Sequence, residues 1–573
     1  MTVPSQRAGA ARPAAPPYPE DPTTATRHMC AGAYLDDEFR NLSLRQVYHQ
    51  PRRMVAPSYG FDLVPVLGHC LRARNAAVVR DAAIVVAFLG AFCFAGTAFV
   101  GGLVLLVYLQ VFVSTYRLVR DTYQRMKTPD AAGGKLVPRA AFLLLGWALV
   151  IFCSFAFSGL FVGALATSFL EGGSSGAVAT TGVAIFGSLA LAAVFVGFQV
   201  SFALWRQGEL GKLTPGRQVA PPTRTPRLDE IARQQRGNTV AYSGYRPFVG
   251  SGFQEDTWSF AQRLVRPAAG PAERLLNGEA RHAVTALPSE RQREFEEAPF
   301  DAEEVIDYVR EHLATLIPVH GAEAEERIPG LTVEDRVFLA GTEVSHLVPY
   351  TEPQVMAAVI RYPTTPARHY LTCQIFSWGG ELITTVYVHI AVQGRSLYIE
   401  MTTTVLPPCN DDYRVVDTVE NTGSGAWLRA IRHGIVDAPQ TVWKSPLSLF
   451  RGLVDVSRSS TAGQVGPAGL TRGYDYGAVI GVRELACREE GMRNLVQALD
   501  FEKYQKLIER RVIASVLDFL DERGIDTTEY RARAASVLNV NHLNNVNGNV
   551  GSIGDNNTFN QQVAGSMGGG GRP

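Results

Sequence analysis

The chain lacks charge where it is most apolar. Between Ala82 and Trp205, three long apolar stretches contain no Lys, Arg, Asp or Glu. A run of about 20 apolar residues matches the roughly 30 Å hydrocarbon layer of a bilayer, so these stretches are typical of membrane-spanning helices. The same absence argues against an ion-coupled pump or a voltage sensor, because those proteins place ionisable groups at membrane depth.

Paired cysteines and an excess of charge are also absent. The seven cysteines among 573 residues show no C-x-x-C spacing, and the formal net charge is zero. Neither a zinc knuckle nor a nucleic-acid coat is therefore expected, and such sparse cysteine use fits a reducing cytosol. The first 27 residues have no apolar core, so we expect internal spans, rather than a cleaved signal peptide, to direct insertion.

The familiar catalytic and nucleotide-binding motifs are missing as well. H-E-x-x-H, Walker and G-x-G-x-x-G patterns do not occur, and Gly172-Gly-Ser-Ser-Gly176 matches G-x-S-x-G only within a glycine- and serine-rich turn between two predicted spans. The sequence therefore names no catalytic, cofactor-binding or metal-binding residue, and we expect no cofactor. Whether the protein is an enzyme stays open, with the balance against it, since enzymes without such motifs exist.

The apolar block is best interpreted as four helices. The first stretch, from Ala82 to Tyr116, would be roughly 50 Å long as one helix, and Gly101-Gly102 near its middle permits a tight reversal. We therefore predict spans at 82–100, 102–116, 141–168 and 178–205, against a rival count of three. Basic residues flank the block on both sides, which places both termini in the cytoplasm of a multi-pass plasma-membrane protein.

Composition divides the chain into seven segments. The predicted fold class is a multi-span α-helical membrane domain plus an α+β cytoplasmic domain that contains an antiparallel β-meander. The predicted segments are a disordered tail (1–27), a short cytoplasmic helical region (28–80), a four-helix transmembrane domain (81–205), a basic Pro-rich linker (206–240), the α+β domain (241–460, meander 369–406), a helical region (461–538) and an Asn/Gly-rich tail (539–573).

The clearest soluble signal is the meander. Trp378-Gly-Gly-Glu381 and Gln393-Gly-Arg-Ser396 are typical of two-residue hairpin turns. Both turns fix a register that keeps one sheet face apolar, and a slip by one residue would destroy that pattern. The register sets His389 opposite Glu400, with Tyr370 on the other side of His389. This pair is the one candidate acid–base couple; its alternative is an ordinary cross-strand contact.

Three further patterns bear on the cytoplasmic part. Apolar spacing predicts amphipathic helices at 302–317 and at about 501–523, the second ending at Gly524. Glycines alternate with aromatic residues in 241–253. Backbone N–H groups in such turns can hold an anion, so the alternatives here are a ligand loop and a packed turn.

The C-terminal segment is rich in asparagine. Its composition permits self-assembly, because Asn and Gln ladders stack in cross-β structures. Ile553-Gly-Asp-Asn-Asn-Thr-Phe559 resembles the core of RIP homotypic interaction motifs and related microbial amyloid-signalling motifs, with Ile553, Gly554, Asn557 and Phe559 at the matching positions. It departs from them at Ser552 and Phe559, where glutamine and methionine are usual. A plain disordered tail is the alternative.

Four segments together resemble uncharacterised multi-pass membrane proteins of actinobacteria. They are Cys30-Ala-Gly-Ala-Tyr-Leu-Asp, Ala56-Pro-Ser-Tyr-Gly-Phe-Asp-Leu-Val-Pro, Tyr245-Arg-Pro-Phe-Val-Gly-Ser-Gly and Gly524-Ile-Asp-Thr-Thr-Glu. The resemblance implies a bacterial plasma membrane and no assigned activity. We expect a membrane-anchored cytoplasmic sensing or interaction module whose partners are the lipid bilayer, other copies of the chain and a cytoplasmic protein. The alternatives are an oligomeric channel or exporter component and a membrane-tethered enzyme.

Overall fold

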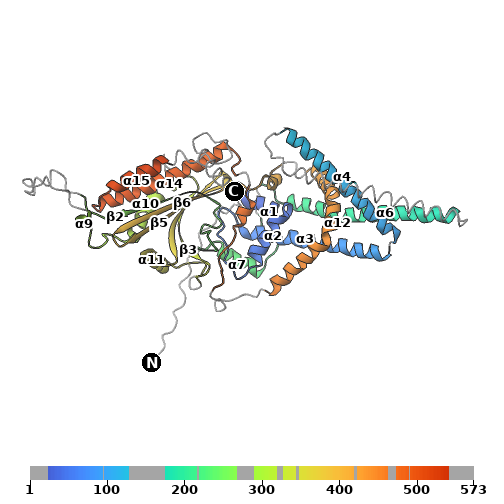
Figure 1. Ribbon diagram of the computed structural model, residues 1–573, viewed down its shortest axis with the longest axis horizontal. Coiled ribbons are helices and arrows are strands. Elements are labelled where there is room, and N and C mark those ends of the chain that lie inside the picture. The colour runs from blue at the N-terminus through green and yellow to red at the C-terminus, as the bar shows by residue number, and fades with distance from the viewer. Residues whose placement is uncertain are drawn as a thin grey trace, which may run out of the picture. The chain divides into compact units, whose positions relative to one another are not determined.

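The chain forms two compact units. The α+β unit comprises Met1–Gly68, Arg217–Arg414 and Gly463–Pro573, and the helical unit comprises His69–Gly216 and Val415–Ala462. The computed structural model (Figure 1) describes residues 24–94, 96–127, 147, 174–215, 219–267, 290–318, 327–343, 347–418, 423–461, 473–488 and 491–540. The predicted division into seven segments is otherwise untested, although the helix at 424–461 groups with the helical unit and not with the rest of 241–460.

A six-stranded sheet organises the α+β unit, in the order β1-β3-β4-β5-β6-β2. The strands are β1 (Thr239–Tyr242), β2 (Phe253–Arg263), β3 (Leu331–Ala340), β4 (Arg368–Ser377), β5 (Leu382–Gln393) and β6 (Ser396–Leu406). β1 pairs with β3 in parallel, whereas the other neighbours are antiparallel. The sheet is therefore mixed, and its larger extent corrects the expectation of a simple antiparallel meander.

The predicted strand register is confirmed. Cys373 lies opposite Val386, and Ile390 lies opposite Ile399. The second turn has two residues, because Gln393 pairs directly with Ser396. The first turn is longer than predicted: Ser377 pairs with Leu382, and a 3₁₀ turn, η5 (Trp378–Gly380), fills the connection. The register is unchanged because the observed loop is longer than the predicted one by one residue on each side.

One face of the sheet packs on helices. The helices are α10 (Ala302–Ala314), α14 (Leu495–Glu522) and α15 (Thr528–Val540), and their apolar sides form one cluster with the apolar side chains of β4, β5 and β6. Both predicted amphipathic helices are present, although α10 ends at Ala314 and not at residue 317, and α14 begins at Leu495 and not at about residue 501. Gly524 ends α14 with a φ of 64°, a conformation that glycine adopts without a Cβ clash.

The opposite face is covered in part by segments distant in the sequence. Phe248 stacks on Tyr387 with ring centroids 4.4 Å apart, and Ala56, Val249 and Ala478 join the same cluster. The remaining elements of this unit are α1 (Thr24–Leu35), α2 (Asp37–Ser43), η1 (Leu44–Tyr48), α7 (Pro226–Gln234), α9 (Glu290–Arg293), α11 (Pro353–Arg361), η6 (Asp411–Asp417, which runs on into the helical unit) and α13 (Val482–Ala486).

Three helices are long and apolar enough to cross a membrane in the part of the chain that the structure describes. They are α3 (Leu63–Phe94), α4 (Thr97–Lys127) and α6 (Ser174–Leu210). The predicted hairpin is present, but its turn lies at Gly96, with a φ of 49°, and not at Gly101-Gly102. Gly102 instead sits inside α4, where an added Cβ would lie 3.0 Å from Leu191 of α6. The predicted span at 141–168 falls outside the described residues.

The three helices bring their charged ends together. Phe92 and Phe88 of α3 meet Phe99 of α4, and Arg80 of α3 lies 4.5 Å from the ring of Phe202 on α6. An added Cβ at Gly187 of α6 would lie 2.9 Å from Ala98 of α4. α3 is therefore antiparallel to α4 and α6, so the basic residues that precede α3's apolar run and follow those of α4 and α6 occupy one end.

Helix α12 (Ser424–Thr461) crosses α3, α4 and α6, as Figure 1 shows in orange. The sequence analysis did not single it out, because its apolar residues alternate with polar ones and two prolines, Pro439 and Pro446, lie inside it. Proline usually marks the end of a helix in a sequence pattern.

Candidate functional site: a carboxylate on the open sheet face

Glu400 of β6 stands at the centre of a polar cluster on the sheet. Its two carboxylate oxygens accept hydrogen bonds from the hydroxyls of Tyr370 and Tyr398, at 2.9 and 3.0 Å. Arg368 lies 3.8 Å away, with its side chain 57% exposed. Strand alternation puts all three partners on Glu400's face of the sheet. The cluster is therefore assembled by β4 and β6 from residues that only the strand register brings together.

The predicted pair, His389 and Glu400, is a cross-strand pair in the structure, but the imidazole does not bind the carboxylate. Nδ1 of His389 lies 2.8 Å from the backbone oxygen of His369, and the ring sits beside Tyr370 with centroids 5.3 Å apart. The Glu400 oxygens are occupied by the two tyrosines. The arrangement corresponds to the cross-strand alternative more closely than to an acid–base couple.

Protonation states in the cluster follow from burial. Burial raises the pKa of Tyr370 far above its usual value, and the negative charge of Glu400 raises it further. Burial lowers the pKa of His389, against the weaker opposing effect of its hydrogen bond to the His369 backbone. At neutral pH Tyr370 is therefore a neutral hydrogen-bond donor and His389 an uncharged imidazole. Glu400 carries the negative charge of the cluster, and Arg368 carries the positive one.

The sheet face beside Glu400 is open. Ser259 of β2 pairs with Glu400 and is exposed, as is Ala261, which pairs with Tyr398. A charged group that is partly buried, hydrogen-bonded and still reachable from one side is a common basis for ligand recognition. Within the described ranges no group of three or more His, Cys, Asp or Glu side chains is placed to hold a metal ion.

A second imidazole–carboxylate contact lies on the other face, and sequence reasoning missed it. Nε2 of His369 lies 2.8 Å from Asp335, which also binds Arg310 at 2.9 Å. Burial alone would raise the pKa of Asp335, but the contacts with His369 and Arg310 lower it. The contact depends on the pairing of β3 with β4. A loop and α11 separate those strands in the chain, so no short turn revealed their register.

The glycine–aromatic loop holds an anion, and that anion belongs to the chain itself. One oxygen of Glu484 accepts hydrogen bonds from the backbone N–H groups of Gly250 and Gly252, at 2.7 and 3.1 Å. The other oxygen accepts one from Gly481 at 3.0 Å. The two alternatives raised by the sequence are thus combined: the loop has the geometry of an anion cradle, and it packs around an internal carboxylate.

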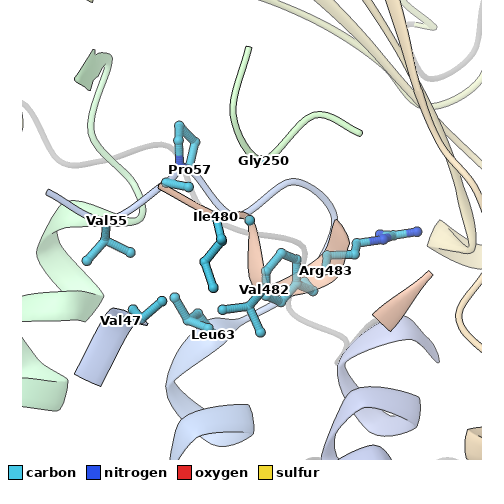
Figure 2. A pocket seen from close by; sticks show the side chains of 11 residues that line it. Val47, Val55, Pro57, Leu63, Gly250, Ile480, Val482 and Arg483 are labelled. Atoms are coloured by element: carbon cyan, nitrogen blue, oxygen red, sulfur yellow. The ribbon is translucent and has the colours of Figure 1, made fainter. Parts of the chain in front are cut away.

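The pocket beside this loop is small and largely apolar. Figure 2 shows Val47, Leu63, Ile480 and Val482 facing one another, while the guanidinium of Arg483 points away from them. The space is sufficient for about one water molecule. This pocket as it stands is too small for a cofactor, and it ranks below the Glu400 cluster as a binding site.

The self-assembly motif predicted at Ile553, Gly554, Asn557 and Phe559 lies outside the described residues, so it stays a prediction. Among the residues the structure does describe, Arg368 and Tyr398 are cluster members that the sequence analysis did not name. A signal for Tyr398 was available, because the predicted register already placed Tyr398 and Glu400 on the same sheet face.

The fold defines the class of protein: a membrane-associated chain that joins apolar helices to an α+β unit. The family model of the AbeC-like domain matches residues 257–558, more than half of the 573 residues, and the chain belongs to this family. The matched segment contains the strands β3–β6 and also α12. No curated protein and no solved structure matches the chain.

Proposed function

We propose that the chain is a multi-pass membrane protein that displays a cytoplasmic interaction module. The observation that carries the topology is the common position of the basic residues in the helical unit. Arg80 before the apolar run of α3, Arg117 after that of α4 and Arg206 after that of α6 share one end of the helices. Positively charged flanks remain on the cytoplasmic side.

The proposed four-span count fits the ends of the helices. α4 finishes at the basic end, and α6 starts at the opposite end. Both Leu63 and Leu210, the outer ends of α3 and α6, belong to the basic side. With the predicted span at 141–168, four crossings return the chain to the side from which it started, and both termini lie in the cytoplasm. The actinobacterial plasma membrane remains part of this proposal.

The partner-binding role rests on the Glu400 cluster. Its carboxylate is held in one position by two neutral tyrosines, and its open side faces solvent beside the exposed Arg368. A fixed negative charge next to a positive one offers a partner two polar anchors, and fixing them beforehand reduces the entropy lost on binding. We propose that a cytoplasmic protein segment binds across β2 and β6 at this point.

Topology is tested by protease protection. An epitope tag after Pro573 of the full chain should survive protease added to intact cells and disappear once the membrane is permeabilised. Cleavage in intact cells would reject the cytoplasmic placement.

Binding is tested by photo-crosslinking in cells, with a photoreactive amino acid at Ser259 of the full chain. A discrete adduct is expected, and it should weaken when Glu400→Gln or Arg368→Gln is added. The control position is Arg533, which is exposed on α15 away from the cluster. No adduct at Ser259, or the same adducts at both positions, would contradict the proposal. The pore and enzyme alternatives stay predictions from the sequence, and no arrangement in the described ranges favours either.

A further inference from the structure

Helix α12 contacts the apolar helices through small residues. An added Cβ at Gly434 would lie 2.8 Å from the backbone of Val200 on α6, and one at Gly452 would lie 3.0 Å from Val78 on α3. Ala430, Ala438 and Ser445, which are buried, complete this side of α12. Small side chains allow helix backbones to approach closely, so α12 is seated directly on the helices that it crosses.

The crossing takes place where the apolar runs meet the charged ends. On α3 the α12 contacts are Val78 and Asp81, immediately before the uncharged run begins at Ala82. On α4 the contact is Arg117, whose guanidinium lies 2.7 Å from Asp437 of α12. On α6 the contacts are Val200, fewer than two turns before Arg206, and Gly208, where an added Cβ would lie 3.9 Å from Trp427 of α12. The contacts on all three helices thus lie close to their basic ends.

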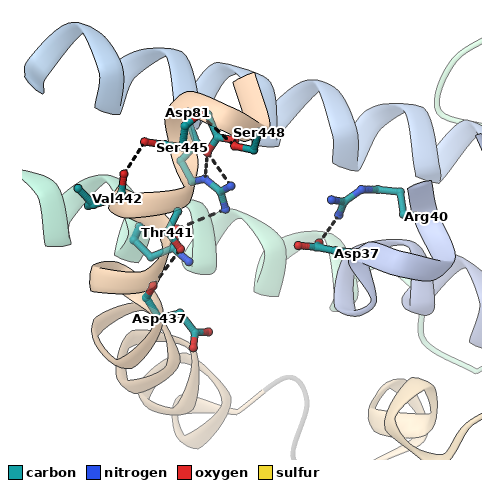
Figure 3. A network of polar contacts seen from close by, with 10 residues as sticks. Asp37, Arg40, Asp81, Asp437, Thr441, Val442, Ser445 and Ser448 are labelled. Carbon is teal, nitrogen blue, oxygen red and sulfur yellow. Dashed lines mark hydrogen bonds and ion pairs between the residues drawn. The ribbon is translucent and has the colours of Figure 1, made fainter. Parts of the chain in front are cut away.

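At Pro446 a side-chain hydroxyl replaces the hydrogen bond that proline removes from α12. Pro446 has no N–H to offer the carbonyl of Val442, four residues earlier. Figure 3 shows that the hydroxyl of Ser445 donates to that carbonyl instead, at 2.8 Å. The figure also shows Ser448 donating to Asp81, whose other oxygen binds Arg80 at 2.7 Å. The polar side chains of this crossing therefore satisfy the Val442 carbonyl and join α12 to α3.

The free surface of α12 has an apolar flank and a polar flank. Apart from Trp427, which is 44% exposed and lies on the side of α12 that contacts α6, six large apolar side chains are between 39% and 69% exposed: Leu428, Ile435, Trp443, Leu447, Phe450 and Leu453. At about 100° per residue they fall within an arc of about 120°. The polar flank consists of His433, Gln440, Lys444 and Arg451, within an arc of about 40° on the other side of the seated face.

Two arginines, Arg429 and Arg432, lie within the apolar arc. A long Arg side chain can keep its stem in an apolar layer while its charged head reaches the headgroups. The arrangement is that of an interfacial helix, with basic residues on one flank and Trp, Phe and Leu on the other.

We propose that α12 lies in the cytoplasmic surface of the bilayer, with its apolar flank in the acyl-chain boundary of the inner leaflet and its polar flank among the headgroups. The phospholipid leaflet is the occupant that the structure favours, because α12 crosses at the level where the apolar runs begin. The outward side chains of those runs, such as Val86 and Phe112, are exposed too and continue the same apolar surface. The proposal rests on the membrane anchoring proposed above.

The test uses Trp443 as a depth probe in the full chain, reconstituted into phosphatidylcholine–phosphatidylglycerol vesicles. The signal is the difference in tryptophan emission between the wild-type chain and Trp443→Phe. Bromine atoms on the acyl chains close to the headgroup should reduce this difference about twofold or more, because an interfacial helix lies roughly 5–10 Å deep. Bromine near the end of the acyl chains should have less effect.

Two controls fix the interpretation. The corresponding difference for Trp378→Phe, a 42% exposed tryptophan of the α+β unit, should be insensitive to both lipids. In the Trp443→Phe background, the emission of the Phe450→Trp variant should be quenched by the shallow bromine. The emission of the Lys444→Trp variant should instead be quenched by iodide in the buffer.

A Trp443 difference as insensitive as that of Trp378 would overturn the proposal, as would stronger quenching by the deep bromine. Flotation of the vesicles separates these results from a failure of anchoring. A chain that does not float with lipid contradicts the proposed membrane placement and not only that of α12.

Discussion

Arg483 provides the strongest test of how the α+β unit is held together. Its side chain is completely buried, and its guanidinium donates hydrogen bonds to three backbone oxygens: Tyr59 at 3.2 Å, Gly380 at 2.8 Å and Glu381 at 2.6 Å. These acceptors belong to an N-terminal segment and to the β4–β5 turn, which are hundreds of residues apart. One cation thus joins three stretches of chain through their carbonyl groups.

Replacing Arg483 with Met keeps the approximate length of the side chain and removes all three donors. Each carbonyl then remains buried without a partner, at about 1–3 kcal/mol per group, partly offset because the buried charge is also removed. We expect a loss of roughly 3–5 kcal/mol in the free energy of unfolding. For a cooperative unit of this size that corresponds to a fall of about 4–6 °C in Tm.

The assay is thermal unfolding of the detergent-solubilised full chain, followed by intrinsic fluorescence. Arg483→Lys should fall between the wild type and Arg483→Met, since an ammonium group reaches fewer of the fanned acceptors. Arg533→Met is the matched control, because its ion pair with Glu529 is 53% exposed on the arginine side and worth about 0–0.5 kcal/mol. Equal Tm values for Arg483→Met and Arg533→Met would refute the reasoning.

Three further outcomes are expected. Gly187→Val should lower the Tm of the helical unit, because its Cβ would lie 2.9 Å from Ala98, whereas Gly90→Val, with nothing within 4 Å, should not; similar shifts in detergent would contradict the proposed packing. Burial lowers the pKa of His389 in the folded protein. The neutral imidazole therefore stabilises the fold above the unfolded-state pKa of about 6.5, and this contribution is lost as the pH falls through the folded-state pKa. The Tm of His389→Gln should depend less on pH below about 7 than the Tm of the wild type. Glu484→Ala removes the acceptor of the backbone N–H groups of Gly250, Gly252 and Gly481 and should lower the free energy of unfolding by about 2 kcal/mol or more. Limited proteolysis should then cut the 245–252 loop faster than in the wild type. An unchanged cleavage rate would contradict the role of Glu484 in holding this loop.

How much of the fold was predictable depends on the range of the interactions. The β4–β5–β6 register follows from short turns and alternation, and so does the pairing of His389 with Glu400. The pairing of β1 with β3 and of β2 with β6 does not, because long connections carry no register information. The mixed character of the sheet was hidden for this reason.

The same distinction applies to the functional residues. The sequence placed Glu400 and Tyr370 on one face of the sheet, but it did not show which hydrogen bonds they would form. Side-chain reach decides that point: the two tyrosine hydroxyls reach the carboxylate, while the imidazole of His389 turns to a backbone oxygen. In the helical unit, the Gly101-Gly102 pair is typical of a turn, but Gly102 lies inside α4 and packs against Leu191 of α6. A single sequence does not distinguish a glycine in a turn from a glycine at a helix contact.

The loop at Gly250 and Gly252 brings its own negative ion on a covalent tether. A tethered carboxylate competes for these N–H groups at an effective concentration of the order of millimolar or higher. Dissolved phosphate or sulfate would therefore have to displace a competing anion that cannot diffuse away. The loop therefore excludes dissolved anions. It also contacts the N-terminal segment at Ala56, the β4–β5 hairpin at Tyr387 and the C-terminal part of the chain at Glu484.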